Sequence, residues 1–106
     1  MKLLTESIKN IFREKRPLYS TENIEDPKVV VKFFNPAGAG SWYITEGREE
    51  PNGDWLFFGL CDILEPELGY VLLSQLQQLK LPYGLTIERD LYFDGHLSDA
   101  YKECER

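Results

Sequence analysis

The chain has 106 residues, of which 42% are hydrophobic and 13% aromatic, and its formal net charge at pH 7 is −6. This length suits one domain, 1–106, with enough apolar residues for a core, which excludes a chain disordered throughout. Direct tight binding to nucleic acid or to an anionic membrane needs positive potential, so the net charge disfavours both. Cys61 and Cys104 lack disulfide or CxxC spacing. We recognise no signal peptide or membrane span and expect a cytoplasmic protein of unknown oligomeric state.

The first 17 residues have the pattern of an amphipathic helix. Apolar side chains recur with the spacing of one buried stripe, namely Leu4, Ile8, Ile11 and Phe12. Thr5 suits the N-cap, and Pro17 ends the helix. A neighbouring stripe is basic and consists of Lys2, Lys9, Arg13 and Arg16. Such a stripe could contact phosphate or lipid, although a solvated helix face is the simpler interpretation.

A loop and a strand follow this helix. Residues 17–27 are mostly polar and bounded by prolines, which predicts a loop. Residues 28–34 are rich in β-branched and aromatic side chains, which predicts a strand. The sequence NPAGAG at 35–40 then indicates a turn with an adjustable backbone.

Residues 41–49 and 54–62 predict a β-hairpin. Asn52-Gly53 between them favours a tight reversal. In the first strand, Trp42, Ile44 and Glu46 would share a face because side chains alternate along a strand. The second strand is apolar on both faces, which indicates a position inside the sheet.

The second half of the chain predicts, in order, a loop at 63–67, a strand at 68–73, a helix at 75–80, a turn at 81–84, a strand at 85–93 and a helix within 96–106. Ser74 suits the N-cap of the first helix, with Leu76 and Leu79 facing inward. The pattern predicts an α+β fold: one domain with an antiparallel-rich sheet of about five strands, an N-terminal helix and one or two short helices.

Arg89 interrupts an apolar face of the predicted last strand, and Glu46 interrupts the face of Trp42 and Ile44. A guanidinium removed from water needs carboxylate partners, so we predict that Arg89 pairs with Glu46, with Asp62 or Glu67 nearby. Two interpretations remain open. The pair either fixes the register of the sheet, or it lines a pocket for a ligand, to which Asp62, Glu67 and Tyr70 could also contribute.

Glu88 and Asp90 would point to the opposite face from Arg89. Two carboxylates at this spacing can hold a divalent ion or perform acid/base chemistry, but a solvated strand face explains them as well. His96 is the only histidine, so a His-rich metal site cannot form within one chain. Because phosphate-binding and nucleophile motifs are also missing, we expect neither a metal nor a cofactor.

Several short motifs occur in one order: KFFNPAGAGSWYITE, FGLCD, PELGYV and GLTIERDLYF. Together they resemble an uncharacterised bacterial family, domain of unknown function 2958, over a core at 32–93. The resemblance implies an accessory protein of a plasmid or integrative element, and it implies no activity, cofactor or catalytic residue. Leu72 and Leu73 depart from the family, which tends to have a small polar residue there, so the start of the short helix is expected to shift.

Two functions follow as hypotheses. The first is a non-enzymatic binding or regulatory protein with a protein partner, in keeping with the small size and acidic charge. The second is a small hydrolase, metal-dependent or acting by acid/base chemistry, in which Arg89 holds an anionic substrate. Its carboxylates would come from Glu46, Glu67, Glu88 and Asp90. A pocket in which Arg89 and two carboxylates converge would favour the hydrolase.

Overall fold

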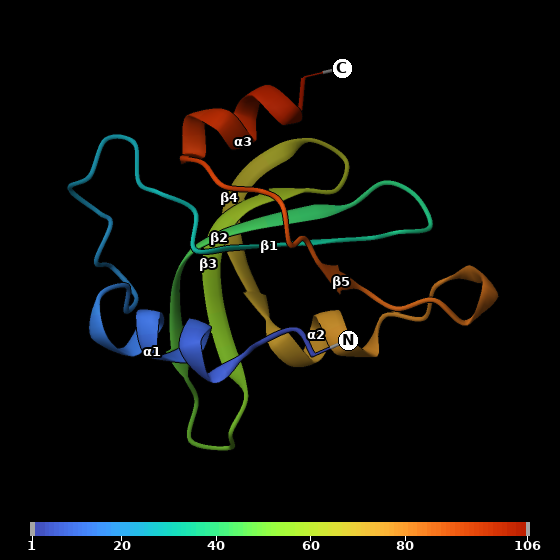
Figure 1. Cartoon of the computed structure of the whole chain (residues 1–106), viewed down its shortest axis with the longest axis horizontal. Helices are drawn as coiled ribbons and strands as arrows, with labels where there is room; N and C mark the ends of the chain where they lie inside the picture. The colour runs from blue at the N-terminus through green and yellow to red at the C-terminus, as the bar shows by residue number, and fades with distance from the viewer. Residues whose placement is uncertain (1, 106) are drawn as a thin grey trace.

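Hairpins between consecutive strands build most of the sheet (Figure 1). The computed structural model describes residues 2–105. Five antiparallel strands lie in the order β4-β3-β2-β1-β5. Their bounds are Val31–Phe34 (β1), Ser41–Glu49 (β2), Trp55–Asp62 (β3), Pro66–Leu72 (β4) and Glu88–Arg89 (β5). The helices are Glu6–Glu14 (α1), Leu73–Gln78 (α2) and Leu97–Glu103 (α3), with a 3-10 turn at Pro82–Gly84. The predicted α+β class is confirmed.

The reversal between β2 and β3 forms where Asn52-Gly53 predicts it. Gly53 has a φ of 88°, a left-handed conformation that glycine adopts without steric cost. The Asn52 side chain accepts a hydrogen bond from the Asp54 backbone N–H at 3.0 Å. These two local features set the register of the longest hairpin in the sheet.

A β-bulge at Thr45 changes which way Glu46 points. Ile44 pairs with Gly59, but Glu46 pairs with Phe58, so β2 has one extra residue between them. The extra residue reverses the alternation of side chains beyond it. Glu46 therefore lies on the opposite face from Trp42 and Ile44, and the predicted shared face is wrong.

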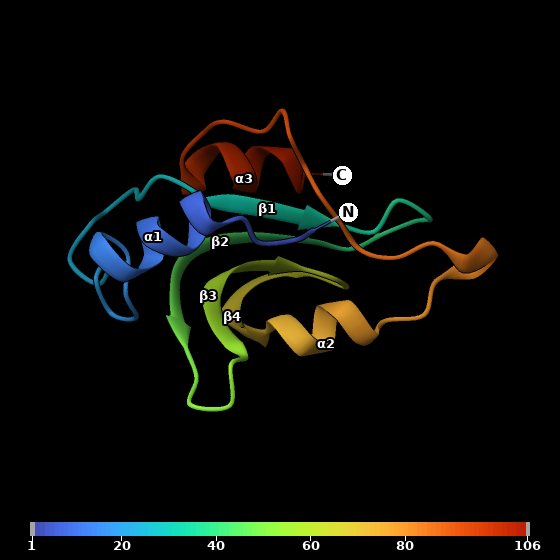
Figure 2. The ribbon, with the colours of Figure 1, turned by 60° about the horizontal axis from the view of Figure 1, so that its bottom comes forward.

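The two faces of the sheet carry separate cores. On the first, here called the α1/α2 face, eleven buried residues form one cluster: Leu3, Leu4, Phe12, Val31, Phe33, Trp42, Ile44, Trp55, Phe57, Leu76 and Ile87. The second, the α3 face, has a smaller cluster of Val29, Tyr43, Leu60, Ala100 and Cys104. Figure 2 shows α3 on one side of the strongly curved sheet and α2 on the other.

Helix α1 packs closely against β2 and β3. Thr5 is its N-cap, as predicted, and accepts a hydrogen bond from the Ile8 N–H at 3.2 Å. Phe12 is fully buried, as predicted, whereas Ile11 is 41% exposed, so its predicted place in the buried stripe is wrong. A Cβ at Gly47 would lie 2.9 Å from the Phe12 ring, so glycine at this position lets the ring approach the strand.

The short helices α2 and α3 have the same kind of N-terminal anchor. The Asp54 carboxylate accepts hydrogen bonds from the Ser74 N–H at 3.0 Å and its hydroxyl at 2.5 Å. Likewise, Asp26 accepts from the Ser98 N–H at 2.8 Å and its hydroxyl at 2.7 Å. Each serine is the second helical residue. An aspartate far away in sequence therefore satisfies N–H groups that the helix leaves unpaired.

Several predicted boundaries differ from the structure. The strand predicted at 28–34 begins at Val31. Helix α2 begins at Leu73, so Ser74 lies inside the helix, and Leu79 is 42% exposed. Strand β4 begins at Pro66, within the predicted loop. The predicted strand 85–93 is reduced to the two residues of β5, because Asp90 bonds the N–H groups two and three residues further on and turns the chain. Among residues 2–105, no helix has the length and apolar content to span a membrane.

Candidate functional site

Glu46 anchors a loop rather than an arginine. Its side chain is 3% exposed. One carboxylate oxygen accepts the Tyr19 N–H at 2.8 Å, and the other accepts the Thr21 N–H at 3.0 Å together with the Thr21 hydroxyl. Three donors from one segment thus surround the carboxylate, which compensates for its removal from water. The loop at 17–27 is held against the α3 face through this contact.

A hollow of about 390 Å³ opens beside Glu46. Tyr19 and Tyr70 stand at its edge, and 60% and 52% of their respective surfaces are exposed. Burial, the nearby Tyr19 hydroxyl and the Glu46 carboxylate all raise the pKa of Tyr70, although Arg48 lowers it. The loop already satisfies Glu46, so the polar groups left beside the hollow include the two tyrosines and the exposed carboxylates of Glu22 and Glu25.

Arg89 lies in a different part of the molecule from Glu46. Arg89 pairs with Phe33 on β1, and Phe33 pairs with Trp42 on β2. Arg89 is therefore level with Trp42, which lies about 13 Å along β2 from Glu46. Its guanidinium donates to the carbonyl oxygens of Lys2 at 2.7 Å and Leu3 at 3.2 Å. The predicted Arg89–Glu46 pair is therefore wrong. Arg89 binds the N-terminal segment to the edge strand β5 on the α1/α2 face.

The other binding candidates do not surround Arg89 either. Asp62 is 7% exposed and ends β3 opposite Ser41. Glu67 lies on β4 opposite Cys61, at the far edge of the sheet from β5. Tyr70 stacks against Phe58 on the α3 face, with ring centroids 5.0 Å apart. The predicted cluster of Arg89 and Glu46, with Asp62 or Glu67 nearby, is therefore not assembled.

Asp90 belongs to a polar cluster beneath α3. The Lys32 ammonium lies 2.9 Å from Glu103 and 3.4 Å from Asp90. It also lies over the ring of Tyr43, whose hydroxyl donates to Glu103 at 2.8 Å. Burial raises the pKa of Asp90, but two backbone N–H groups and the Lys32 ammonium outweigh it and lower the pKa below its usual value. These contacts fasten α3 to the sheet.

Glu88 points to the same side of β5 as Asp90 but does not converge with it on an ion site. Glu88 pairs with Phe34 in register, whereas Asp90 is turned toward Lys32. Among residues 2–105, no three His, Cys, Asp or Glu side chains are grouped so that they could hold a metal ion. In the same range, every buried side-chain nitrogen or oxygen has a hydrogen-bond partner.

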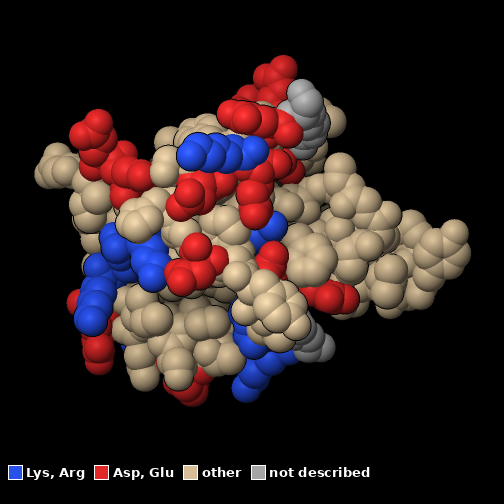
Figure 3. Space-filling model, turned by 45° about the horizontal axis from the view of Figure 1, so that its top comes forward, with Lys and Arg blue, Asp and Glu red and all other residues tan. Residues whose placement is uncertain are grey.

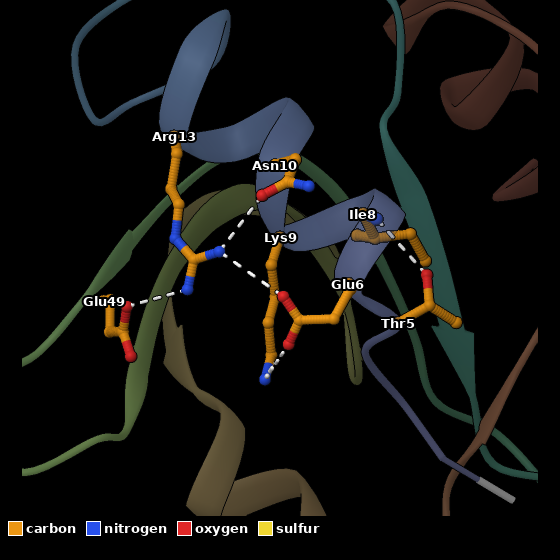
Figure 4. A network of polar contacts seen from close by, with 7 residues as sticks. All are labelled: Thr5, Glu6, Ile8, Lys9, Asn10, Arg13 and Glu49. Atoms are coloured by element: carbon orange, nitrogen blue, oxygen red, sulfur yellow. Dashed lines mark hydrogen bonds and ion pairs between the residues drawn. The ribbon is translucent and has the colours of Figure 1, made fainter.

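Two residues of the basic stripe, Lys9 and Arg13, are paired with carboxylates within the molecule (Figure 4). Arg13 lies 3.0 Å from Glu49 on β2 and 3.6 Å from Glu6, and Lys9 lies 3.5 Å from Glu6. The Arg13 guanidinium also covers the Trp55 ring at 5.5 Å. Glu49 raises the pKa of Arg13 chiefly through its hydrogen bond. The stripe thus fixes the orientation of α1 on the hairpin, and its charge is partly neutralised.

A second hollow runs along β4, the strand at one edge of the sheet. This β4 groove has a volume of about 750 Å³ and lies between β4, the loop at 63–65 and α2. Its apolar lining includes Trp42, Cys61, Leu64, Leu68, Val71 and Leu79. Leu64 and Leu68 are 90% and 49% exposed. Burial raises the pKa of the Cys61 thiol, so the groove presents a neutral, apolar floor.

The structure also exposes apolar residues away from the groove. Figure 3 shows acidic side chains gathered over α3 and an arm on the right with few charged residues. By its place in Figure 1, this arm contains the 3-10 turn. Tyr83 at this turn is 96% exposed and has a φ of 61°. Tyr92, in the chain that returns from the arm, is 92% exposed.

Comparison with known proteins assigns the chain to a family. A family model described as protein of unknown function (DUF2958) matches residues 3–103. The chain belongs to this family, and the match includes all of α1 and α3, which lie outside the predicted core at 32–93. No curated protein and no solved structure gives a significant match.

Sequence reasoning did not find the β4 groove. The chain segment 63–67 was expected to be a loop, and Leu79 was expected to face inward. One signal was present: Ile63-Leu64 is an apolar pair within this segment, where polar turn residues are usual. The groove itself depends on α2 meeting β3 and β4, which local sequence does not encode.

Proposed function

We propose that this protein is a non-enzymatic binding or regulatory protein that docks a protein partner in the β4 groove. The apolar groove at the open edge of the sheet carries this proposal. Contiguous exposed apolar surface next to a polar rim is characteristic of protein interaction sites. A cytoplasmic location and a role as an accessory protein of a plasmid or integrative element belong to the same proposal, and the second rests on the family resemblance.

The positions of the charged residues support binding rather than hydrolysis. Glu46 and Arg89, which the hydrolase would need together, bond to backbone groups on opposite faces of the sheet. Asp90 is engaged by Lys32 and by the turn that follows β5. A general acid or base has to reach a substrate, and these side chains instead hold segments of the chain.

A capture experiment with matched variants tests the proposal. The groove variant is Gly69→Lys, because a Cβ at Gly69 has no atom within 4 Å and a lysine can enter the groove without a clash. The control is Gly38→Lys, at a second glycine with open space, outside the groove. Tagged wild type and both variants are cross-linked in the source cells, and captured proteins are quantified by mass spectrometry.

We expect a protein that is captured by the wild type and by Gly38→Lys but lost with Gly69→Lys. Urea unfolding of the three purified proteins checks that Gly69→Lys remains folded. Equal capture by all three proteins, or no protein enriched above an untagged control, would contradict docking in the groove.

A further inference from the structure

Strand β4 is an edge strand that the fold leaves open. It has seven residues and pairs with β3 along its length, from Pro66 opposite Asp62 to Leu72 opposite Leu56, without a bulge. The outer side of an antiparallel edge strand presents unpaired N–H and C=O groups. The backbone of β4 can therefore accept one more strand.

The opposite edge of the sheet is different. Strand β5 has only two residues, and Arg89 within it binds the carbonyl oxygens of Lys2 and Leu3. Short length and cover by another segment are two of the ways in which proteins prevent unwanted pairing. Among residues 2–105, no strand pairs with the outer side of β4, which has seven residues. Its guards are Pro66 and Glu67 at its start, and the LGYVL that follows has no proline and no charged side chain.

Side-chain sites lie on both faces beside this edge. Gly69 and Val71 border the β4 groove on the α1/α2 face, and space above Gly69 is free. Leu68 and Tyr70 also border the groove, but they pair with Leu60 and Phe58 and so point to the α3 face, where they are 49% and 52% exposed. Because side chains of an added strand alternate between the two faces, one set would enter the groove and the other would cover Leu68 and Tyr70.

The charges beside β4 indicate which kind of segment could pair with it. Among the described residues that line the β4 groove, Glu65 and Glu67 are charged and no Lys or Arg is present. The whole chain carries a net charge of −6. A second copy of the chain would bring its own negative charge to the same edge, which opposes self-pairing. A segment with Lys or Arg near Glu65 and Glu67 is complementary instead.

We propose that the β4 edge binds an extended segment of a partner protein as an additional strand. This segment has apolar residues at alternate positions and at least one Lys or Arg at the end that meets Glu65 and Glu67. The inference rests on the proposed docking function and specifies how the partner binds. Main-chain hydrogen bonds to β4 supply part of the affinity, and the groove supplies selectivity for side chains.

The test uses the whole protein and a random peptide library as the probe. Phage displaying peptides of about 12 residues, long enough for one strand, are selected on the immobilised protein. The selected peptide is synthesised, and its Kd is measured by fluorescence anisotropy with wild type, Gly69→Lys and Gly38→Lys. We expect basic, alternating apolar peptides that bind Gly69→Lys about tenfold or more weakly and Gly38→Lys with unchanged affinity.

A scan of N-methyl groups along the peptide separates strand addition from other docking in the groove. Methylation removes one backbone donor, and only every second N–H of an added strand faces β4. We therefore expect weaker binding from methylation at alternate residues, with little effect between them. If Gly69→Lys abolishes binding but methylation shows no alternation, strand addition is overturned while the docking function stands.

Two further outcomes would count against the inference. Selection of acidic peptides, or affinity unaffected by Glu65→Gln with Glu67→Gln, would overturn the basic character of the partner. In sedimentation velocity, we expect the wild type to show no dimer formed through the β4 edge. A wild-type dimer that is lost in Gly69→Lys would identify a second copy of the chain as the occupant of this edge.

Discussion

The two faces of the sheet are covered by different means. On the α1/α2 face, the ring of Phe12 lies 5.9 Å from Trp55 and 5.6 Å from Phe57, within a cluster of eleven buried apolar residues. The α3 face has a smaller apolar cluster and depends on the contacts of Glu46 and Lys32. The α1/α2 face also has polar contacts, such as Arg13 with Glu49 and Ser74 with Asp54, but its larger apolar area supplies more of the stabilisation there. The α3 face depends more on polar contacts to position segments that bury less.

This difference bears on where the molecule can bind a partner. Polar contacts on the α3 face engage Glu46 and Asp90, two of the charged residues that sequence reasoning assigned to chemistry. On the α1/α2 face, the apolar cluster ends at β4, where α2 covers the sheet incompletely and the groove begins. The lining of the β4 groove is thus the part of this apolar surface that solvent, or a partner, can reach.

The largest effect is expected on the α1/α2 face, from Phe12→Ala. Phe12 is fully buried between two aromatic rings, so the change leaves a cavity and should lower the free energy of unfolding by about 3–5 kcal/mol. Urea unfolding measures the loss. Ile11→Ala on the same helix is the control and should cost about 1 kcal/mol or less, because Ile11 is 41% exposed. Equal losses would contradict the dominance of the aromatic cluster.

On the α3 face, Glu46→Leu should cost about 2–4 kcal/mol, because two backbone N–H groups and the Thr21 hydroxyl lose their acceptor. Arg89→Leu should cost about 1–2 kcal/mol, since the carbonyl oxygens it leaves are closer to solvent. The two side chains act on different faces, so the double variant should be additive within about 0.5 kcal/mol. A larger coupling energy in this double-mutant cycle would show that Glu46 and Arg89 interact, contrary to the structure.

Tyr43→Phe tests the polar cluster beneath α3 with a smaller change. The variant keeps the ring that stacks on Phe93 and loses the hydrogen bond to Glu103. We expect a loss of about 1 kcal/mol and faster hydrogen exchange in α3, with exchange in α1 unchanged. Equal acceleration in both helices would show that the two faces do not respond separately.

The smallest expected effect is on the pH dependence of stability. One aspartate on each face of the sheet should contribute to it. The Ser74 hydroxyl lowers the pKa of Asp54, and the Ser98 hydroxyl lowers the pKa of Asp26, from an ordinary value of 3.8. A carboxyl group with a lower pKa in the folded protein than in the unfolded protein stabilises the fold at pH values above its unfolded pKa. This stabilisation is lost as the pH falls through the folded pKa. The free energy of unfolding of the wild type, measured in urea, should therefore fall as the pH is lowered from about 5 to 2.

The variants Asp54→Asn and Asp26→Asn should each be less stable than wild type near pH 6, with the difference shrinking toward pH 2. Asp94→Asn, at an exposed carboxylate paired only with Lys28 among the contacts described, serves as the comparison and should change little. A constant difference across this pH range would show that the two aspartates do not act through their charge.

Local patterns in the sequence were sufficient for much of the fold. The polar residue Thr5 before an amphipathic stretch predicted where α1 begins, and Asn52-Gly53 predicted the β2–β3 reversal. Alternation along 54–62 correctly separated Trp55 and Phe57 from Leu60. These features depend on residues close together in the chain, whose conformational preferences survive in the folded protein.

The site required information that a local pattern does not contain. The bulge at Thr45 reversed the direction of Glu46, and nothing in the alternation of β2 marks one extra residue. Asp90 ended the last strand early by bonding the N–H groups of Tyr92 and Phe93, which removed the apolar row in which Arg89 was placed. Both errors concern register, and one residue of register moves a side chain to the other face.

The sequence by itself determined the α+β class, the β2–β3 hairpin and the membership of residues 3–103 in one family. Only the tertiary structure decided that Glu46 and Arg89 serve separate segments and that β4 ends the sheet beside an apolar groove. Local preference sets how a strand or helix begins, but the partners of a buried charge and the open edge of a sheet depend on which distant segments meet. Those contacts are selected by the burial and hydrogen bonding of the whole chain.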